Sequence, residues 1–210
     1  GFQYRKHGDL KGAMTEWKRY LSESERLIQA NVANPDWRME NLLASTHLGT
    51  LELQEFGCGA AQDRLKSSLF KMKHMIDNGN KRLSWQYHWL VTRSWVTRCH
   101  AESGLVAKAS AEFELEIADL RALLEKSPAS TNWIQQLSSL LHFSAIQSVN
   151  SGQLNDAESK IAEAIELLDI VTRLHPENED WRRIRVSALA RGGEVARLRG
   201  NDSLALARLS

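Results

Sequence analysis

The sequence predicts an all-α fold, a right-handed α-solenoid built from antiparallel helix pairs. The first observation is a repeat: four of the seven tryptophans, Trp37, Trp85, Trp133 and Trp181, are spaced by 48 residues each time. The second is composition, because 3 prolines and 12 glycines in 210 residues leave long stretches free to be helical. Self-similarity at a fixed period of this size is typical of repeat proteins. About nine helices fit into the chain.

Small residues follow the same period as the tryptophans. One column consists of alanines, one of glycines in which Phe56 replaces the expected residue and Gly57 follows it, and one of mixed small residues. These columns are Ala13, Ala61, Ala109, Ala157 and Ala205; Gly8, Gly104, Gly152 and Gly200; and Gly49, Thr97, Ala145 and Gly193. We interpret the tryptophans as packing residues, since a large aromatic that recurs once per repeat joins neighbouring layers.

Each repeat divides into two helices at its glycine. Helix A runs from the tryptophan to just before the glycine and helix B begins just after it, because apolar residues recur at helical spacing on both sides and glycine accepts the positive φ of a tight turn. The expected helices are 9–32, 36–55, 58–78, 84–103, 105–126, 132–151, 153–174, 180–199 and one beginning near 202. The first eight residues are expected to be the end of another helix A.

The residues between repeats mark the helix ends. Pro35, Pro128 and Pro176 each follow a helix B, and proline forces its predecessor into an extended conformation. The residue before each tryptophan has an oxygen-bearing side chain of the type that caps helix N-termini. The predicted caps are Asp36, Ser84, Asn132 and Asp180.

These boundaries predict one repeat domain over residues 1–210. Its repeats are a partial one near 1–36, complete ones at 37–84, 85–132 and 133–180, and a partial one at 181–210. The chain reads as a fragment of a larger protein.

The pattern inside a repeat resembles the tetratricopeptide repeat (TPR). Its signature of Leu-Gly in helix A, then Gly, Ala and an aromatic or aliphatic residue is matched, for example, by Gly104, Ala109 and Phe113, and by Gly152, Ala157 and Ile161. The period of 48 residues departs from the standard length of about 34. With repeat entries such as those at 34–38 and 177–182, the chain resembles long-period arrays attached to bacterial signalling proteins, including serine/threonine kinases and transcription regulators. The resemblance implies a signalling or docking module.

Composition and motifs exclude several functions. The net charge of +1 opposes nucleic-acid binding, which needs a Lys or Arg for each phosphate. No apolar run approaches the 18 to 20 residues of a membrane span, so we expect no membrane insertion. The phosphate-loop, hydrolase and zinc motifs are missing from the sequence, so we expect no enzyme activity, no cofactor and no metal. We favour the cytoplasm, or the periplasm if a membrane span lies upstream.

Two further features leave alternatives open. Cys58 and Cys99 belong to adjacent layers and are close enough in the predicted stack to be neighbours, but we do not expect a disulfide. Residues 181–210 hold seven arginines against Glu194 and Asp202. This excess indicates either a helix that normally packs on an acidic neighbour and is exposed because the array is truncated, or a surface for an acidic or phosphate-bearing partner.

The A helices are expected to line the concave side of the stack, where repeat proteins bind their partners. The free arc of each helix A lies 2, 6, 9 and 13 residues after its tryptophan. It comprises Met39, Leu43, Thr46 and Thr50; Tyr87, Val91, Ser94 and Arg98; Gln135, Ser139, His142 and Ile146; and Arg183, Ser187, Ala190 and Glu194. This mixture of small polar and aliphatic side chains favours a peptide over a buried metabolite.

From this arc we select the side chains best suited to contact a protein or peptide partner: Tyr87, Ser94, Arg98, Gln135, His142 and Arg183. One alternative is a small-molecule sensor with a closed pocket around Tyr87, Trp89 and Trp95. Another is a structural spacer or dimerisation element, with self-association through the incomplete end repeats.

Overall fold

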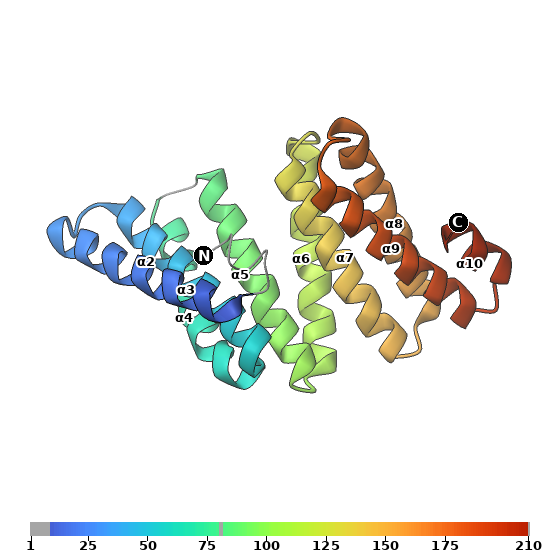
Figure 1. The fold of residues 1–210 in the computed structure, drawn as a ribbon, viewed down its shortest axis with the longest axis horizontal. Coiled ribbons are helices and arrows are strands. Elements are labelled where there is room, and N and C mark those ends of the chain that lie inside the picture. Colours follow the sequence, from blue (N-terminus) through green and yellow to red (C-terminus); the bar gives the residue numbers. More distant parts are fainter. Residues whose placement is uncertain (1–8, 80–81, 210) are drawn as a thin grey trace. The chain divides into compact units, whose positions relative to one another are not determined.

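The computed structural model describes residues 9–79 and 82–209, and this part of the chain is an all-α helical repeat solenoid (Figure 1). Within each of its two compact units, helices that follow one another in the chain pack together and are joined by short turns. They are α2 (Leu10–Ala30), α3 (Pro35–Phe56), α4 (Cys58–Asp77), α5 (Leu83–Glu102), α6 (Val106–Lys126), α7 (Thr131–Asn150), α8 (Leu154–Leu174), α9 (Glu179–Leu198) and α10 (Asp202–Leu209). These bounds differ from the predicted ones by at most two residues. The helix expected over the first eight residues lies outside the described part.

The turns within repeats use glycine as the sequence predicts. Gly57, Gly104, Gly152 and Gly200 each follow a helix A and have φ of 81°, 80°, 74° and 74°. A side chain with a Cβ is strained in this left-handed region, which explains the glycine column. In the repeat where Phe56 takes the glycine position, α3 extends through Phe56 and the turn occurs one residue later, at Gly57.

The predicted N-caps are wrong for the A helices. Asp36, Ser84 and Asn132 lie inside the first turn, because the helices begin one residue before them, and Asp180 is likewise inside α9. The capping residues precede these positions by two. In two of the four helices the cap is an asparagine: Asn34 Oδ1 accepts from the amide of Asp36 at 2.9 Å, and Asn178 Oδ1 accepts from the amide of Trp181 at 3.2 Å. Trp181 is therefore the third residue of its helix, not the first.

The chain divides into two compact units, residues 1–104 and 105–210. Their boundary falls at the turn between the A and B helices of the repeat at 85–132. The first unit contains α2 to α5 and the second α6 to α10.

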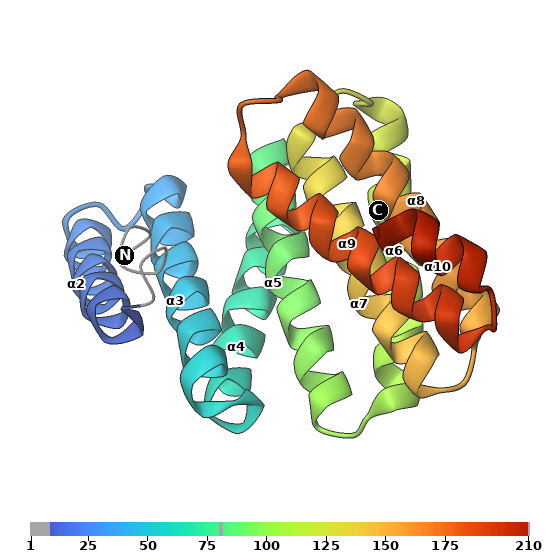
Figure 2. The same cartoon turned by 45° about the vertical axis from the view of Figure 1, so that its right-hand side comes forward.

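In the first unit, each helix packs on its neighbour in the chain (Figure 2). Helix α3 also contacts α5. Leu65 of α4 is fully buried opposite Gly49 of α3. A Cβ on Gly49 would lie 2.8 Å from Leu65 Cδ2, so the small residue lets the two helices approach closely. One core cluster surrounds Leu65 and a second surrounds Trp85, which is 5% exposed.

In the second unit, α8 packs between α7 and α9, and α10 covers α9. Ala145, Ala157, Ile161 and Val195 form one core cluster, in which one member of the mixed small-residue column and one of the alanine column meet larger aliphatic residues. Trp133 and Trp181 are 5% and 9% exposed. The interpretation of the periodic tryptophans as packing residues is confirmed for these two and for Trp85.

Candidate functional site

The helix A surfaces of the second unit form a groove between α7 and α9. It encloses about 210 Å³. Its floor is apolar and its rim polar. The floor consists of Phe143, Leu168, Ile184 and Ala188, and the rim of Ser139, His142, Arg183 and Ser187. Ser138 also lines the groove, but it is buried and its hydroxyl donates to the carbonyl of Ile134.

Helix periodicity positions the rim. Ser139 and His142 lie three residues apart on α7, and Arg183 and Ser187 four apart on α9, so each pair occupies one face of its helix. The ring of His142 meets that of Phe143 edge-on, with centroids 5.8 Å apart. The groove therefore combines an apolar floor with hydroxyl, imidazole and guanidinium groups that can hydrogen-bond a ligand.

The structure brings together only two of the six selected side chains, His142 and Arg183. Gln135 is half-buried on α7 but does not line this groove. Tyr87 is half-buried beside His88, and burial raises the pKa of its phenol. Arg98 lies 4.4 Å above the Trp95 ring and forms an ion pair with Glu102 at 3.8 Å. Burial lowers the pKa of Arg98.

Ser94 is buried, which makes it unfit to contact a partner directly. Its hydroxyl donates to the carbonyl of Val91 at 2.9 Å, so the side chain folds back onto its own helix. Three further positions of the predicted free arc are also buried: Met39, Thr46 and Thr50. For Thr46 the reason is direct packing between A helices, because its hydroxyl lies 3.3 Å from that of Thr92 on α5.

A second groove, in the first unit, was not selected from the sequence. It encloses about 490 Å³ between α2, α3 and α5. It is lined by Glu16, Trp17, Tyr20, Glu40, Leu43, His47 and His88. Of these residues, Leu43 alone belongs to the predicted arc of helix A. The sequence feature that could have indicated this groove is the pair of large ring side chains at Trp17 and Tyr20, because the later repeats have smaller residues at the equivalent positions.

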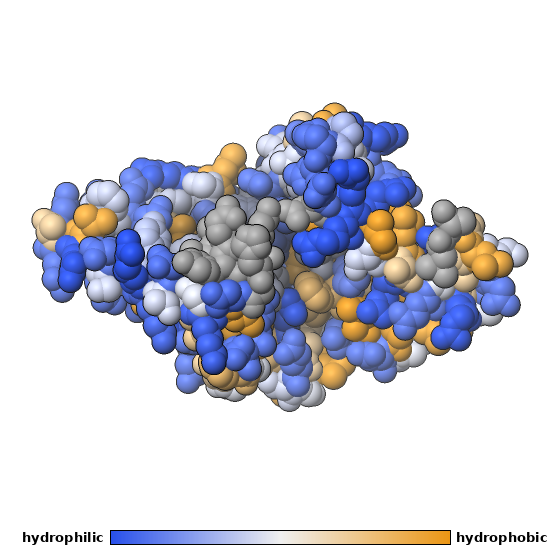
Figure 3. All heavy atoms as spheres, viewed as in Figure 1, coloured by the Kyte–Doolittle hydropathy of each residue, from blue (hydrophilic) through white to orange (hydrophobic). Residues whose placement is uncertain are grey.

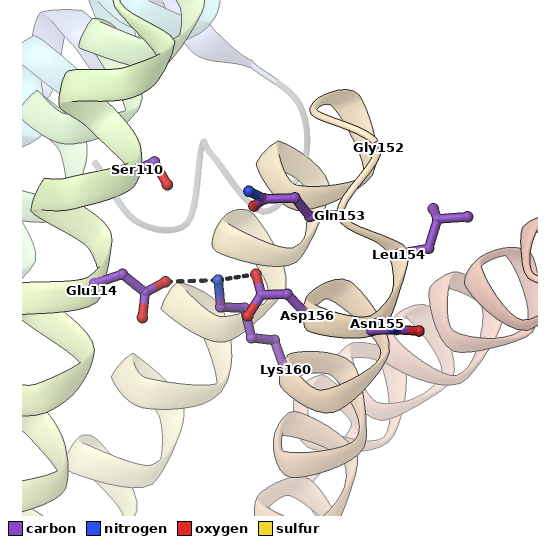
Figure 4. Close-up of a pocket in the computed structure, with 8 residues that line it drawn as sticks. All are labelled: Ser110, Glu114, Gly152, Gln153, Leu154, Asn155, Asp156 and Lys160. Atoms are coloured by element: carbon purple, nitrogen blue, oxygen red, sulfur yellow. Dashed lines mark hydrogen bonds and ion pairs between the residues drawn. The ribbon is translucent and has the colours of Figure 1, made fainter.

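A third, more polar groove lies on the helix B side of the second unit (Figure 4). Lys160 of α8 is 7% exposed, and its ammonium lies 2.6 Å from Glu114 of α6 and 2.5 Å from Asp156. Asp156 also accepts a hydrogen bond from Ser148 of α7. Burial raises the pKa of Asp156, but the hydrogen bonds from Lys160 and Ser148 outweigh it and hold the pKa below its ordinary value. This cluster connects three helices of the unit.

The arginine excess near the C-terminus is largely compensated within the second unit. Arg185 pairs with Asp169 and Arg199 with Glu158, both on the preceding α8. Arg191 pairs with Glu194 on its own helix. These contacts neutralise part of the positive charge with acidic residues of α8 and α9, both of which belong to the second unit. The face drawn in Figure 3 is mainly hydrophilic, with separate apolar patches.

The two cysteines are buried and do not form a disulfide with each other. The Cys58 thiol donates to Glu102 at 3.0 Å, and Cys99 belongs to the same core cluster. Burial is the main cause that raises the pKa of both thiols. Among the described residues, no group of three or more His, Cys, Asp or Glu side chains is arranged to hold a metal ion.

The two tryptophans of the sensor alternative are partly buried and pack against the core. Trp89 packs on the cluster around Trp85, whereas Trp95 packs on the cluster around Leu65. Arg93 covers the Trp89 ring at 5.4 Å. These contacts give no support to a closed pocket built from the two tryptophans. None of the described helices is both long and apolar enough to cross a membrane.

Comparison with solved structures identifies the architecture. BtubC (BKLC) from P. vanneervenii superposes with a TM-score of 0.53 at 13% identity, over 95% of this chain and 88% of that one. A Podosopora anserina protein of the kinesin light chain type, with nearly identical TPR-like repeats, gives 0.54 at 15% identity, over 99% and 87%. A variant of that protein with one substitution gives 0.55 at 15% identity, over 99% and 86%. The fold is a TPR-like helical repeat. No family model and no curated protein sequence matches the chain.

Proposed function

We propose that the chain is a non-catalytic protein-interaction module that binds a peptide segment of its partner in the α7–α9 groove. The observation that supports this proposal is the groove itself, in which residues from the two A helices surround an apolar floor. We further propose that it serves as the docking region of a bacterial signalling protein, as its resemblance to long-period TPR arrays implies.

The chemistry of the groove suits one apolar side chain of the partner and a hydrogen-bond acceptor beside it. Phe143 and Ile184 offer apolar surface, whose burial contributes about 25 cal/mol per Å². Arg183 and His142 supply donors at the rim, and arginine is among the residue types enriched in binding hot spots. A volume near 210 Å³ can hold one side chain of a partner. Pockets that bind small molecules are larger and enclose about 300–1,000 Å³.

Phage-displayed random peptides, panned against the immobilised chain, test the proposal. A Ser187→Trp variant fills the groove without changing its charge, and Ser159→Trp places the same side chain on an exposed position of α8 outside it. We expect the selected peptides to bind the wild type and Ser159→Trp but to lose at least tenfold in affinity for Ser187→Trp. Equal binding to all three would show that the groove is not the binding surface.

A further inference from the structure

Another groove of the first unit lies where α2 and α4, its two B helices, flank the beginning of α3. Figure 2 shows α3 between these two helices. The groove encloses about 360 Å³. Its apolar lining consists of Ile28, Leu42, Phe70 and Met75, and its polar lining of Arg38, Asn41, Lys71 and His74. Phe70 is 73% exposed, so its ring is available to a ligand.

In the second unit, the equivalent space is filled with core side chains. The positions that repeat Ile28, Arg38, Asn41 and Met75 lie two periods of 48 residues later and are all aliphatic: Leu124, Ile134, Leu137 and Val171. Leu124 packs against a buried cluster that contains Ile134 and Val171, and Leu137 is 1% exposed. The groove of the first unit therefore lies where a guanidinium and an amide replace two buried aliphatic side chains.

The two polar replacements leave this space open because they bind elsewhere. The Arg38 guanidinium donates to the carbonyl of Val32, and Asn41 Nδ2 donates to Ser24 Oγ at 3.0 Å. The repeat pattern assigns no other helix of the chain to the space, since side chains alone fill it in the second unit. Ile28 lies in the last turn of α2, whereas residues 1–8 lead into its first turn.

The polar lining of the groove is basic. Arg38, Lys71 and His74 belong to it, and the described residues that line it include no carboxylate. The carbonyl that Arg38 binds is uncharged, and Lys71 is exposed. Within residues 9–79 and 82–209, neither of these two cations forms an ion pair. An anionic group in the groove therefore meets two positive charges that the described chain does not compensate.

We propose that this groove binds a small amphipathic organic anion, whose apolar part contacts Leu42, Phe70 and Met75 and whose carboxylate, sulfonate or phosphate group lies beside Arg38 and Lys71. The charge of the ligand follows from the basic lining. Its size follows from the volume, which lies within the range of about 300–1,000 Å³ of small-molecule pockets. This site is independent of the α7–α9 groove and belongs to the other unit.

Two fluorescent probes with the same rings test the class of ligand. 8-Anilinonaphthalene-1-sulfonate is an amphipathic anion, and N-phenyl-1-naphthylamine lacks its sulfonate; the fluorescence of both increases in apolar surroundings. Each is titrated with the whole chain. We expect saturable binding of the sulfonate and at least tenfold weaker binding of the neutral probe, because only the sulfonate can pair with Arg38 and Lys71. Decanoate, a second amphipathic anion, should displace the sulfonate probe.

Two substitutions locate the site. Asn41→Leu introduces the side chain that fills the equivalent space in the second unit, and Ser24 keeps its hydrogen bond to the carbonyl of Leu21. Lys71→Glu reverses a charge at an exposed position. Both should weaken binding of the sulfonate probe at least tenfold. The control Lys126→Glu makes the same charge change on an exposed position of α6 and should leave the affinity unchanged.

The Ser187→Trp variant separates this site from the α7–α9 groove, which also contains an arginine. We expect it to bind the sulfonate probe as the wild type does. Loss of binding in Ser187→Trp, together with wild-type affinity in Lys71→Glu, would place the probe in the α7–α9 groove and overturn the proposal. The proposed peptide binding there is measured separately, so either proposal can fail alone.

Further outcomes overturn the proposal. They are the absence of saturable binding up to about 1 mM, the Kd of a very weak contact, equal affinity for the neutral probe, and wild-type affinity in Lys71→Glu. The last variant keeps the proposal testable even if Asn41→Leu does not fold, which circular dichroism will show. Sedimentation velocity without probe provides the remaining test. A dimer that Asn41→Leu dissociates would assign the groove to a second copy of the chain instead of a small ligand.

Discussion

Gly49 and Gly59 offer a matched pair of glycine-to-alanine substitutions with opposite expected effects on stability. Both residues are helical and lie in the first unit, Gly49 within α3 and Gly59 in the first turn of α4. A Cβ at Gly49 would lie 2.8 Å and 2.9 Å from two atoms of the Leu65 side chain, whereas a Cβ at Gly59 would meet nothing within 4 Å. The two variants therefore differ mainly in packing, and both gain helix propensity, Gly59→Ala less because it lies near the helix end.

The magnitudes follow from these distances. Alanine gains up to about 1 kcal/mol over glycine in a helix, and at Gly59 a gain of about 0.5 kcal/mol is expected because the residue is near the helix end. At Gly49, in the helix interior, the gain of up to about 1 kcal/mol is opposed by overpacking, which costs about 1–3 kcal/mol. Leu65 is fully buried, so it has little room to move away. The net expectation for Gly49→Ala is a loss of about 1 kcal/mol.

Urea denaturation followed by circular dichroism and tryptophan fluorescence measures both effects. In thermal unfolding, the same loss of about 1 kcal/mol would lower the Tm of a unit of roughly 100 residues by about 4–8 °C. We expect Gly49→Ala to unfold at lower urea than the wild type and Gly59→Ala at slightly higher urea. If Gly49→Ala were as stable as Gly59→Ala, the close approach of α3 and α4 would not be the reason for glycine at position 49.

The other predictions concern a cap, the thiols and one ion pair. Asn178→Ala should lower the free energy of unfolding by about 0.5–2 kcal/mol, measured by the same denaturation, because the α9 cap is lost. Cys58 and Cys99 should react with a thiol reagent at pH 8 only in denaturant, since burial raises their pKa values; fast labelling of the native chain would contradict this. The hydrogen bonds that lower the pKa of Asp156 stabilise the folded chain at pH values above the unfolded pKa of aspartate, about 3.9. This stabilisation is lost as the pH falls through the lower pKa of Asp156 in the folded chain. The free energy of unfolding of Lys160→Met, measured by urea denaturation at a series of pH values, should therefore decrease less below pH 4 than that of the wild type.

Helix positions were predictable from the sequence because glycine and proline restrict the backbone locally. The turn at Gly152 and the entry at Pro35 needed no knowledge of tertiary contacts. Predicting the N-caps also requires the exact residue at which each helix begins. Asp36 and Ser84 have suitable side chains, but the cap is decided by where the chain leaves its extended conformation, which is two residues earlier at Asn34 and Arg82.

The candidate site was predictable only in part. Helical periodicity placed His142 and Arg183 on facing surfaces, and the structure shows both in one groove. It failed for Thr46 and Ser94, which are buried. A period of 3.6 residues tells which side chains share a face of one helix, but the angle at which two A helices cross determines which of them remain exposed. That angle depends on packing across the repeats, such as the contact of Thr46 with Thr92.

The boundary at Gly104 has a consequence for dissecting the chain into fragments. Sequence repeats begin at their tryptophans, so a fragment designed from the repeats would end near residue 84. Such a cut would separate α5 from α4 and remove Val96 and Cys99 from the cluster that buries Leu65. A fragment that ends after Gly104 retains this cluster intact. The unit of sequence duplication and the compact unit of the fold are thus offset by one helix, and truncations should be designed on the second.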